Sequence, residues 1–161
     1  MGKVEVKLLA DFLDGKPIYE MVPAEEVGPN RYRLSASPGF APGIAGGDVI
    51  EVAPAERLGY RVLERSGNVS IQLFLHKCDP EEQAQIVSVM RSIGAWLDGG
   101  KDVMHGSGCL LIFTVPVAVG FGTIEQAMSR ISLEFPVDKW MYGNVYETQD
   151  GTTPLNWWVR R

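Results

Sequence analysis

The sequence has few cysteines and no long apolar run. Two cysteines in 161 residues are too few for a disulfide framework, so both are expected to be reduced thiols. No segment reaches the roughly 18 consecutive apolar residues of a membrane span. The first residues, "MGKVEVKLLADFLDG", also lack the apolar region of a secretory signal. These absences predict a cytoplasmic protein that does not cross a membrane.

Basic charge is scarce as well. The chain carries 15 lysines and arginines against 20 acidic residues, a net charge of −5, and it has no basic stripe. Because nucleic-acid affinity depends on Lys and Arg side chains that neutralise phosphates, the composition argues against DNA or RNA as the main partner. A basic protein fits this charge better.

Recognisable catalytic and metal motifs are missing. The histidines and cysteines do not show the compact ligand spacing of a zinc site, and no G-x-S-x-G elbow is present. The candidate ligands considered for zinc, or for a cysteine nucleophile, are His76, Cys78, His105 and Cys109. The sequence therefore predicts a protein without enzymatic activity, without a metal and without a cofactor.

What the sequence does have is a segment rich in glycine and proline, "SPGFAPGIAGGDVIEVAP". In a phosphate-binding loop the glycines lead into a helix, whose N-terminus faces the phosphate. Here they lead into a strand pattern, and Asp48 places a negative charge where phosphate would sit. We therefore expect a structural loop whose Phe40 and Ile44 side chains turn toward the core, with a tight turn at Gly46–Asp48. The alternative is a loop that gates a ligand site.

The first half of the chain alternates apolar and polar residues as strands do. Short turn-forming segments separate six such stretches, which predicts an antiparallel meander that is curled or barrel-like. The predicted strands are residues 3–12, 17–27, 31–37, 48–54, 59–65 and 69–77.

The second half changes to a helical period. One helix is expected to begin after Asp79, with Pro80 at its first position, and to end at Gly94. A second is expected to be capped by Thr123 and to stop before Pro136. With strands at 69–77, 95–100, 109–117 and 140–147, the order is β-α-β-β-α-β. This order predicts a ferredoxin-like unit with two helices on one sheet face, within an α+β fold.

These patterns predict one domain, residues 1–161, with two lobes. The all-β lobe covers about residues 1–68 and the ferredoxin-like lobe about 69–147, followed by a C-terminal tail at 148–161. The turn Ser66–Asn68 is expected to join the two lobes.

Short motifs in a fixed order resemble a known family. They run from the Tyr32–Leu34 strand to Pro116, and the resemblance extends over most of residues 4–147. The remaining landmarks are Pro38, Phe40, Gly47, Asp48, Ser66, Gly67, Asn68 and Gly94. In this order they resemble the bacterial family known as domain of unknown function 4265. The resemblance implies a bacterial origin and a shared fold, but no activity. Where members have an arginine after the Ser66–Asn68 turn, this chain has Gln72.

Two functions of different class follow. The preferred hypothesis is a non-enzymatic protein-binding domain, such as an immunity protein that neutralises a toxin domain by direct binding. Its predicted partner-binding residues lie in the tail, where tryptophan and arginine are typical of binding hot spots; they are Trp157, Trp158, Arg160 and Arg161. The alternative for the tail is that it folds back and that both tryptophans fill an edge of the core.

An acidic face is a further expectation for the protein-binding hypothesis. Its candidate residues are Glu25, Glu26, Asp98, Asp102, Asp138 and Asp150. The second hypothesis is a small-molecule-binding or enzymatic domain with a pocket between the lobes. That pocket would be lined by Gly47, Asp48, Ser66 and Asn68.

Overall fold

The structure is a computed structural model that describes residues 2–77, 79–102 and 108–159. Its first sheet is a five-stranded antiparallel meander in the order β1-β2-β3-β4-β5. The strands are β1 (Lys3–Leu13), β2 (Lys16–Gly28), β3 (Arg31–Leu34), β4 (Val49–Val52) and β5 (Tyr60–Glu64). Among the described residues β1 and β5 do not pair, so the sheet is open and the predicted barrel-like closure is absent.

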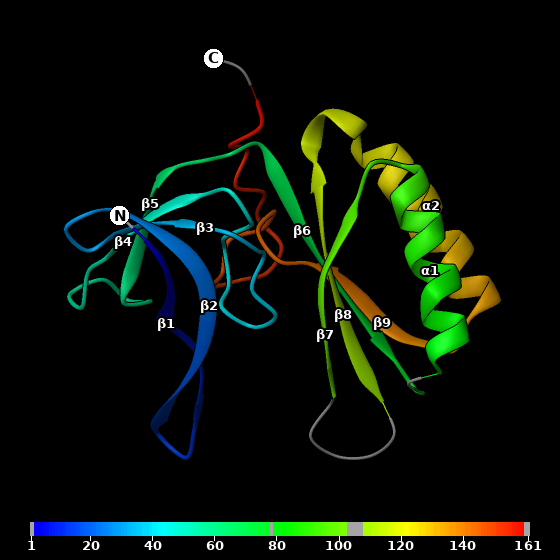
Figure 1. Ribbon diagram of the computed structural model, residues 1–161, viewed down its shortest axis with the longest axis horizontal. Coiled ribbons are helices and arrows are strands. Elements are labelled where there is room, and N and C mark those ends of the chain that lie inside the picture. Colours follow the sequence, from blue (N-terminus) through cyan, green and yellow to red (C-terminus); the bar gives the residue numbers. More distant parts are fainter. Residues whose placement is uncertain (1, 78, 103–107, 160–161) are drawn as a thin grey trace.

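The second sheet carries both helices. Its elements follow as β6 (Asn68–Leu75), α1 (Pro80–Ser92), β7 (Trp96–Asp102), β8 (Cys109–Pro116), the 3-10 turn η1 (Val117–Val119), α2 (Phe121–Glu134) and β9 (Val137–Tyr142). The four strands are antiparallel in the order β7-β8-β6-β9. Figure 1 shows the helices on one face of this sheet and the five-stranded sheet on its other side. The predicted α+β class is confirmed.

The first helix begins where the sequence predicts, and the second does not. The Asp79 carboxylate accepts a hydrogen bond from the Glu81 amide at 3.0 Å, with Pro80 as the first helical residue. Helix α2 begins at Phe121, and Gly120, at φ +97°, takes the cap position without a side-chain hydrogen bond. Thr123 therefore lies inside the first turn, because η1 leads straight into α2 and Gly120 makes the change of direction.

Apolar and polar residues alternate along the strands, and the apolar ones form two separate cores. In β1, Val6 and Leu8 point inward, to the core of the five-stranded sheet. In β6, the residues with odd numbers from Val69 to Leu75 pack beneath the helices. Ser70 and Gln72 on the opposite face of β6 are also buried. The second sheet is thus covered on both faces, which is why β8 is an almost continuous apolar run.

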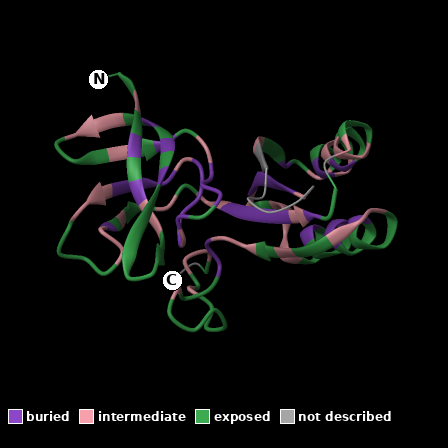
Figure 2. Cartoon of the chain, turned by 90° about the horizontal axis from the view of Figure 1, so that it is seen from below, coloured by how far each residue is buried: buried purple, intermediate pink, exposed green. Residues whose placement is uncertain are grey.

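The loop of residues 35–48 covers this second face. Figure 2 shows buried segments along the strands of the second sheet and in the loop beside them, and exposed segments at the outer ends of the first sheet. Ile44 is buried, as predicted. Phe40 is 50% exposed, so the prediction that it turns toward the core is wrong. Its backbone amide is held by the Glu20 carboxylate at 2.9 Å, and the side chain remains at the surface.

The last strand is shorter than the sequence suggests. The sequence predicts a strand at residues 140–147, but β9 ends at Tyr142, because Gly143 forms a hydrogen bond with the loop instead. The amide of Gly43 donates to the Gly143 carbonyl at 2.8 Å, and that of Gly143 donates to the Ser70 carbonyl at 2.8 Å. Within the described part of the chain, no helix has the length and apolar character needed to cross a membrane.

Candidate functional site

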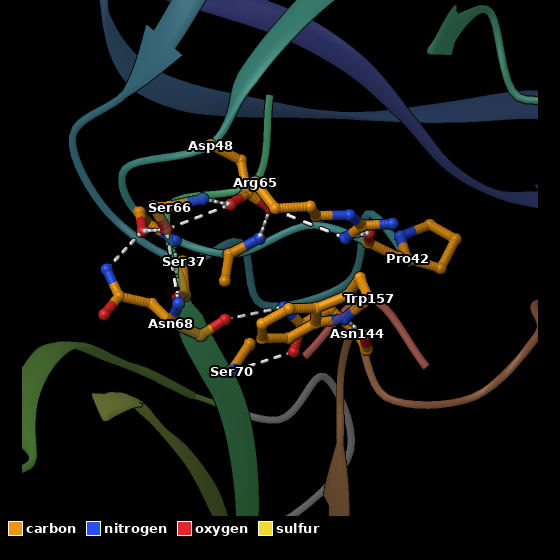
Figure 3. A network of polar contacts seen from close by, with 12 residues as sticks. Ser37, Pro42, Asp48, Arg65, Ser66, Asn68, Ser70, Asn144 and Trp157 are labelled. Atoms are coloured by element: carbon orange, nitrogen blue, oxygen red, sulfur yellow. Dashed lines mark hydrogen bonds and ion pairs between the residues drawn. The ribbon is translucent and has the colours of Figure 1, made fainter. Parts of the chain in front are cut away.

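The four residues predicted to line a ligand cleft come together where the two sheets meet. Figure 3 shows three of them, Asp48, Ser66 and Asn68. Gly47 has φ +91°, and a Cβ atom there would lie 2.7 Å from the Ser66 Cβ and 3.2 Å from the Asn68 side-chain nitrogen. Both the backbone conformation and the close approach require glycine at this position. We call this cluster of Gly47, Asp48, Ser66 and Asn68 the junction.

Asp48 is the centre of the junction. Its carboxylate is fully buried and accepts hydrogen bonds from the Ala45 amide at 3.0 Å and from the Ser66 amide at 2.9 Å. The Arg65 guanidinium lies 3.6 Å away. Burial raises the pKa of Asp48, and the amide hydrogen bonds and Arg65 partly oppose the rise. Burial also lowers the pKa of Arg65.

Ser66 and Asn68 also form side-chain hydrogen bonds within the junction. The Asn68 amide group donates to the Gly46 carbonyl at 2.8 Å, and the Ser66 hydroxyl lies 3.0 Å from both that carbonyl and an Asp48 oxygen. These groups fix the loop to the start of β6. The junction is therefore an internal connection, because these hydrogen bonds join two segments of the same chain.

The tail is anchored next to the junction. The Trp157 indole nitrogen donates to the Asn144 carbonyl at 2.8 Å, and the Arg65 guanidinium lies 5.7 Å from the Trp157 ring centroid. Trp158 packs edge-to-face on Phe121 at 5.1 Å. Both tryptophans are half-buried against the core of the second sheet. Arg160 and Arg161 lie outside the described residues, and the partner-binding role of the tail stays a prediction.

A small cavity of about 120 Å³ lies between the two sheets, and its lining does not include the junction residues. Glu20, Ser37, Asp98 and Ile112 are part of its lining. Small-molecule sites are usually about 300–1,000 Å³, so this cavity has room for only a very small ligand.

Glu20 explains the glycine-rich loop. Its carboxylate accepts hydrogen bonds from three consecutive amides, those of Gly39 at 2.7 Å, Phe40 at 2.9 Å and Ala41 at 2.9 Å. The loop is therefore an anion-binding nest, and the anion is a side chain of the protein. Sequence reasoning missed Glu20. Its signal was a carboxylate at an inward-facing position of β2, in alternation with Val22 and Ala24.

Asp98 ends a chain of hydroxyl groups at the same cavity. The Gly46 amide donates to the Ser37 hydroxyl at 2.9 Å, and the Ser37 and Thr114 hydroxyls lie 2.5 Å apart. Thr114 donates in turn to the Asp98 carboxylate. Burial raises the pKa of Asp98, against the effect of the hydrogen bonds that it accepts.

The other proposed acidic residues lie on different elements. Glu25 and Glu26 are on β2, and Asp138 on β9 is 3.9 Å from His76. Asp150 accepts hydrogen bonds from the Thr153 hydroxyl and from the Thr153 and Thr152 amides of its own turn, which lower its pKa to about 2. The side chain of Asp102 lies outside the described residues.

Of the four zinc candidates, the structure describes His76 and Cys109. Cys109 is buried, and its sulfur lies 3.4 Å from the side-chain nitrogen of Gln83. Cys78 and His105 lie outside the described residues. Over the residues that the structure describes, no three His, Cys, Asp or Glu side chains are placed to hold a metal ion.

Exposed apolar side chains gather on the hairpin of β1 and β2. Phe12 and Leu13 at its tip are 58% and 62% exposed. Beside them a hollow of about 650 Å³ opens along β2, and its lining includes Asp11, Ile18, Tyr19, Met21 and Phe40. Strand β3 pairs with β2 only over Ala24–Gly28, so within the described residues no strand pairs with this edge of β2 at the hollow. Sequence reasoning missed this surface, although two long predicted strands beside a short one suggest an unpaired edge.

Comparison with known proteins shows which family the chain belongs to. The model of a domain of unknown function, DUF4265, matches residues 20–134, which is more than half of the chain. The chain belongs to the DUF4265 family. No curated protein matches it. A solved structure, the "hypothetical protein from Neisseria gonorrhoeae", is similar with a TM-score of 0.59 at 14% identity, over 89% of this chain and 95% of that chain. That likeness shows a shared fold.

The DUF4265 match includes the junction and leaves out β1 and the hairpin tip. Gln72 is buried on the face of β6 that meets the loop, close to Gly143. An uncharged side chain fits this buried position without a counter-ion.

Proposed function

We propose that this DUF4265 protein is a non-enzymatic protein-binding domain that binds an extended segment of its partner along the open edge of β2. The observation that carries the proposal is the coincidence of an unpaired strand edge with an apolar hollow. Strand addition combines the two, because main-chain hydrogen bonds provide affinity and side-chain pockets provide specificity.

The backbone of β2 presents the required groups. In an antiparallel pair, alternate residues direct their N–H and C=O groups to the same neighbour. The Glu26 amide donates to the Gly2 carbonyl of the β1 side, and the Pro23 carbonyl accepts from Ser35 on the other side. Even-numbered residues of β2 therefore face β1, and Tyr19 and Met21 direct their N–H and C=O groups to the open edge.

The side chains around this edge are apolar and exposed. Ile18 is 43% exposed, Tyr19 47%, Met21 51% and Phe40 50%. Contiguous exposed apolar groups of this kind are typical of interaction sites. The pattern fits a partner strand that places an apolar side chain in the hollow.

Charge favours a basic partner. The chain has a net charge of −5, Asp11 lines the hollow, and Asp14 is in the turn of the hairpin. A toxin domain neutralised by direct binding is one partner of this class, so an immunity protein is the specific form of the proposal. A pocket between the lobes is the alternative, supported by the position of Asp98 at the small cavity; the use of the junction residues for internal hydrogen bonds argues against it.

The test is affinity capture from a lysate of the source organism with three forms of the tagged chain. They are the natural chain, the double variant Ile18→Asp/Met21→Asp, and the control Leu133→Asp. Leu133 on α2 is 88% exposed, so the control adds an equivalent charge away from the hairpin. We expect one stoichiometric protein with the natural chain and the control, and its loss with the double variant.

Retention of that protein by the double variant would overturn the β2 edge as the binding surface. If mass spectrometry of the denatured natural chain instead reveals a small molecule, the alternative with a pocket between the lobes replaces the proposal.

Two finer assignments belong to the same proposal. The order β6-α1-β7-β8-α2-β9 and the strand order β7-β8-β6-β9 support a ferredoxin-like unit as the frame behind the binding sheet. The cytoplasm is the compartment expected from the sequence, and it stays a prediction.

A further inference from the structure

We infer that the outer edge of β1 pairs with the β1 edge of a second copy of this chain, in an antiparallel register centred on Val6. This inference goes beyond the proposed function, because it concerns the opposite edge of the hairpin and a different partner. It rests on the backbone direction of β1 and on the order of its charges.

Strand β1 is the end strand of its sheet and is 11 residues long. Long exposed edges pair readily with another strand, and proteins usually protect them. The hydrogen bond from Glu26 to the Gly2 carbonyl shows that even-numbered residues of β1 face β2. Lys3, Glu5 and Lys7 consequently direct their backbone N–H and C=O groups outward, where a second strand would bind.

The side chains of the same three residues are exposed and alternate in charge. In a symmetric antiparallel pair, their order distinguishes between registers. A register centred on Glu5 places Glu5 opposite Glu5 and Lys3 opposite Lys7, and one centred on Lys7 places two lysines opposite each other. The register centred on Val6 places Glu5 opposite Lys7 twice.

The same register suits the apolar face. Val4 then lies opposite Leu8 of the second copy, and Val6 lies opposite Val6, so the two cores meet along the new strand pair. Lysines on an edge strand ordinarily prevent association by repulsion. In this chain Glu5 stands between the two lysines, and the edge becomes complementary to itself. The Lys7 ammonium lies 4.4 Å from the Tyr19 ring centroid, on the β2 side of β1.

Sedimentation velocity of the purified chain over a range of concentrations tests the pairing. We expect a monomer–dimer equilibrium for the natural chain. Glu5→Lys alone and Lys7→Glu alone should each weaken the dimer by about tenfold, because each creates like-charge pairs. The double swap Glu5→Lys/Lys7→Glu should restore it. All these side chains are exposed, so circular dichroism should show unchanged folding.

Lys3→Glu is the matched control for the register. Centred on Val6, Lys3 faces Leu9 and its reversal should leave the dimer unchanged. Centred on Lys7, it faces Asp11 and the reversal would weaken the dimer. The inference is wrong if the natural chain is monomeric at every concentration. It is also wrong if the double swap dimerises as weakly as the two single variants. Ile18→Asp/Met21→Asp should remain dimeric, so the failure of this inference and that of the proposed function are distinguishable.

Discussion

The junction and the β1–β2 hairpin use their residues in opposite ways. The junction is rich in glycine and polar side chains, yet its buried Asp48 is bound by amides of the same chain. The hairpin carries apolar side chains that a core would normally bury, and they are exposed around an open strand edge. The comparison teaches that residues of a kind found in ligand sites can be structural, whereas exposed apolar strand residues are the basis of the proposed binding surface.

The largest effect is expected from breaking the junction. Asp48→Ala removes a buried carboxylate that holds two amides, the Ser66 hydroxyl and Arg65, and should lower the free energy of unfolding by about 4 kcal/mol. Urea denaturation measures the loss. Asp150→Ala is the control, since that carboxylate also accepts three hydrogen bonds but is exposed. Equal losses for the two variants would contradict the account of the junction.

The next effect concerns the anion nest. Glu20→Ala leaves the amides of residues 39–41 without their acceptor and should cost about 2–3 kcal/mol. Acetate should then raise the melting temperature of the variant more than that of the natural chain, because it can occupy the vacated nest. Glu20→Gln, which retains one acceptor oxygen, should be intermediate. An equal response of all three proteins to acetate would show that the amides are satisfied in another way.

A smaller effect depends on pH. Burial raises the pKa of Asp98, so the folded state binds its proton more tightly than the unfolded state does. Stability from this group is therefore present at low pH and is lost as pH rises through the raised value. Asp98→Asn removes the dependence, so the natural chain should gain stability relative to the variant between about pH 7 and pH 4. The pKa of Asp48 is raised in the same direction, but Asp48 is present in both proteins and its effect cancels in the comparison. Urea denaturation at each pH measures the two stabilities. If the natural chain and Asp98→Asn differ by the same amount at every pH in this range, the assignment is wrong.

The smallest effect on stability is expected at the hairpin. Ile18→Asp/Met21→Asp changes exposed side chains outside both cores, so its free energy of unfolding should stay within about 0.5 kcal/mol of the natural value. Urea denaturation beside Leu133→Asp provides the check. A loss of several kcal/mol would mean that the hollow is part of the folded core.

Periodicity predicted most of the fold. The alternation in β1 and β2, and the Asp79–Pro80 start of α1, are local signals that the structure bears out. The start of α2 could not be predicted from Thr123, because a preceding 3-10 turn moved the cap to Gly120. Sequence reasoning also grouped Gly47, Asp48, Ser66 and Asn68 as the lining of a ligand cleft. The structure places the four residues in contact, and their ligand role stays a prediction. That their hydrogen bonds point inward depends on the packing of two sheets, which no local pattern encodes.

Hydrogen exchange of the chain with and without its captured partner tests the central claim most directly. Binding along the open edge of β2 predicts slower exchange at the Tyr19 and Met21 amides, which point away from β1, with the amides of Ala45 and Ser66 unchanged. Protection confined to the junction or to the C-terminal tail, with Tyr19 and Met21 exchanging as in the free chain, would contradict it.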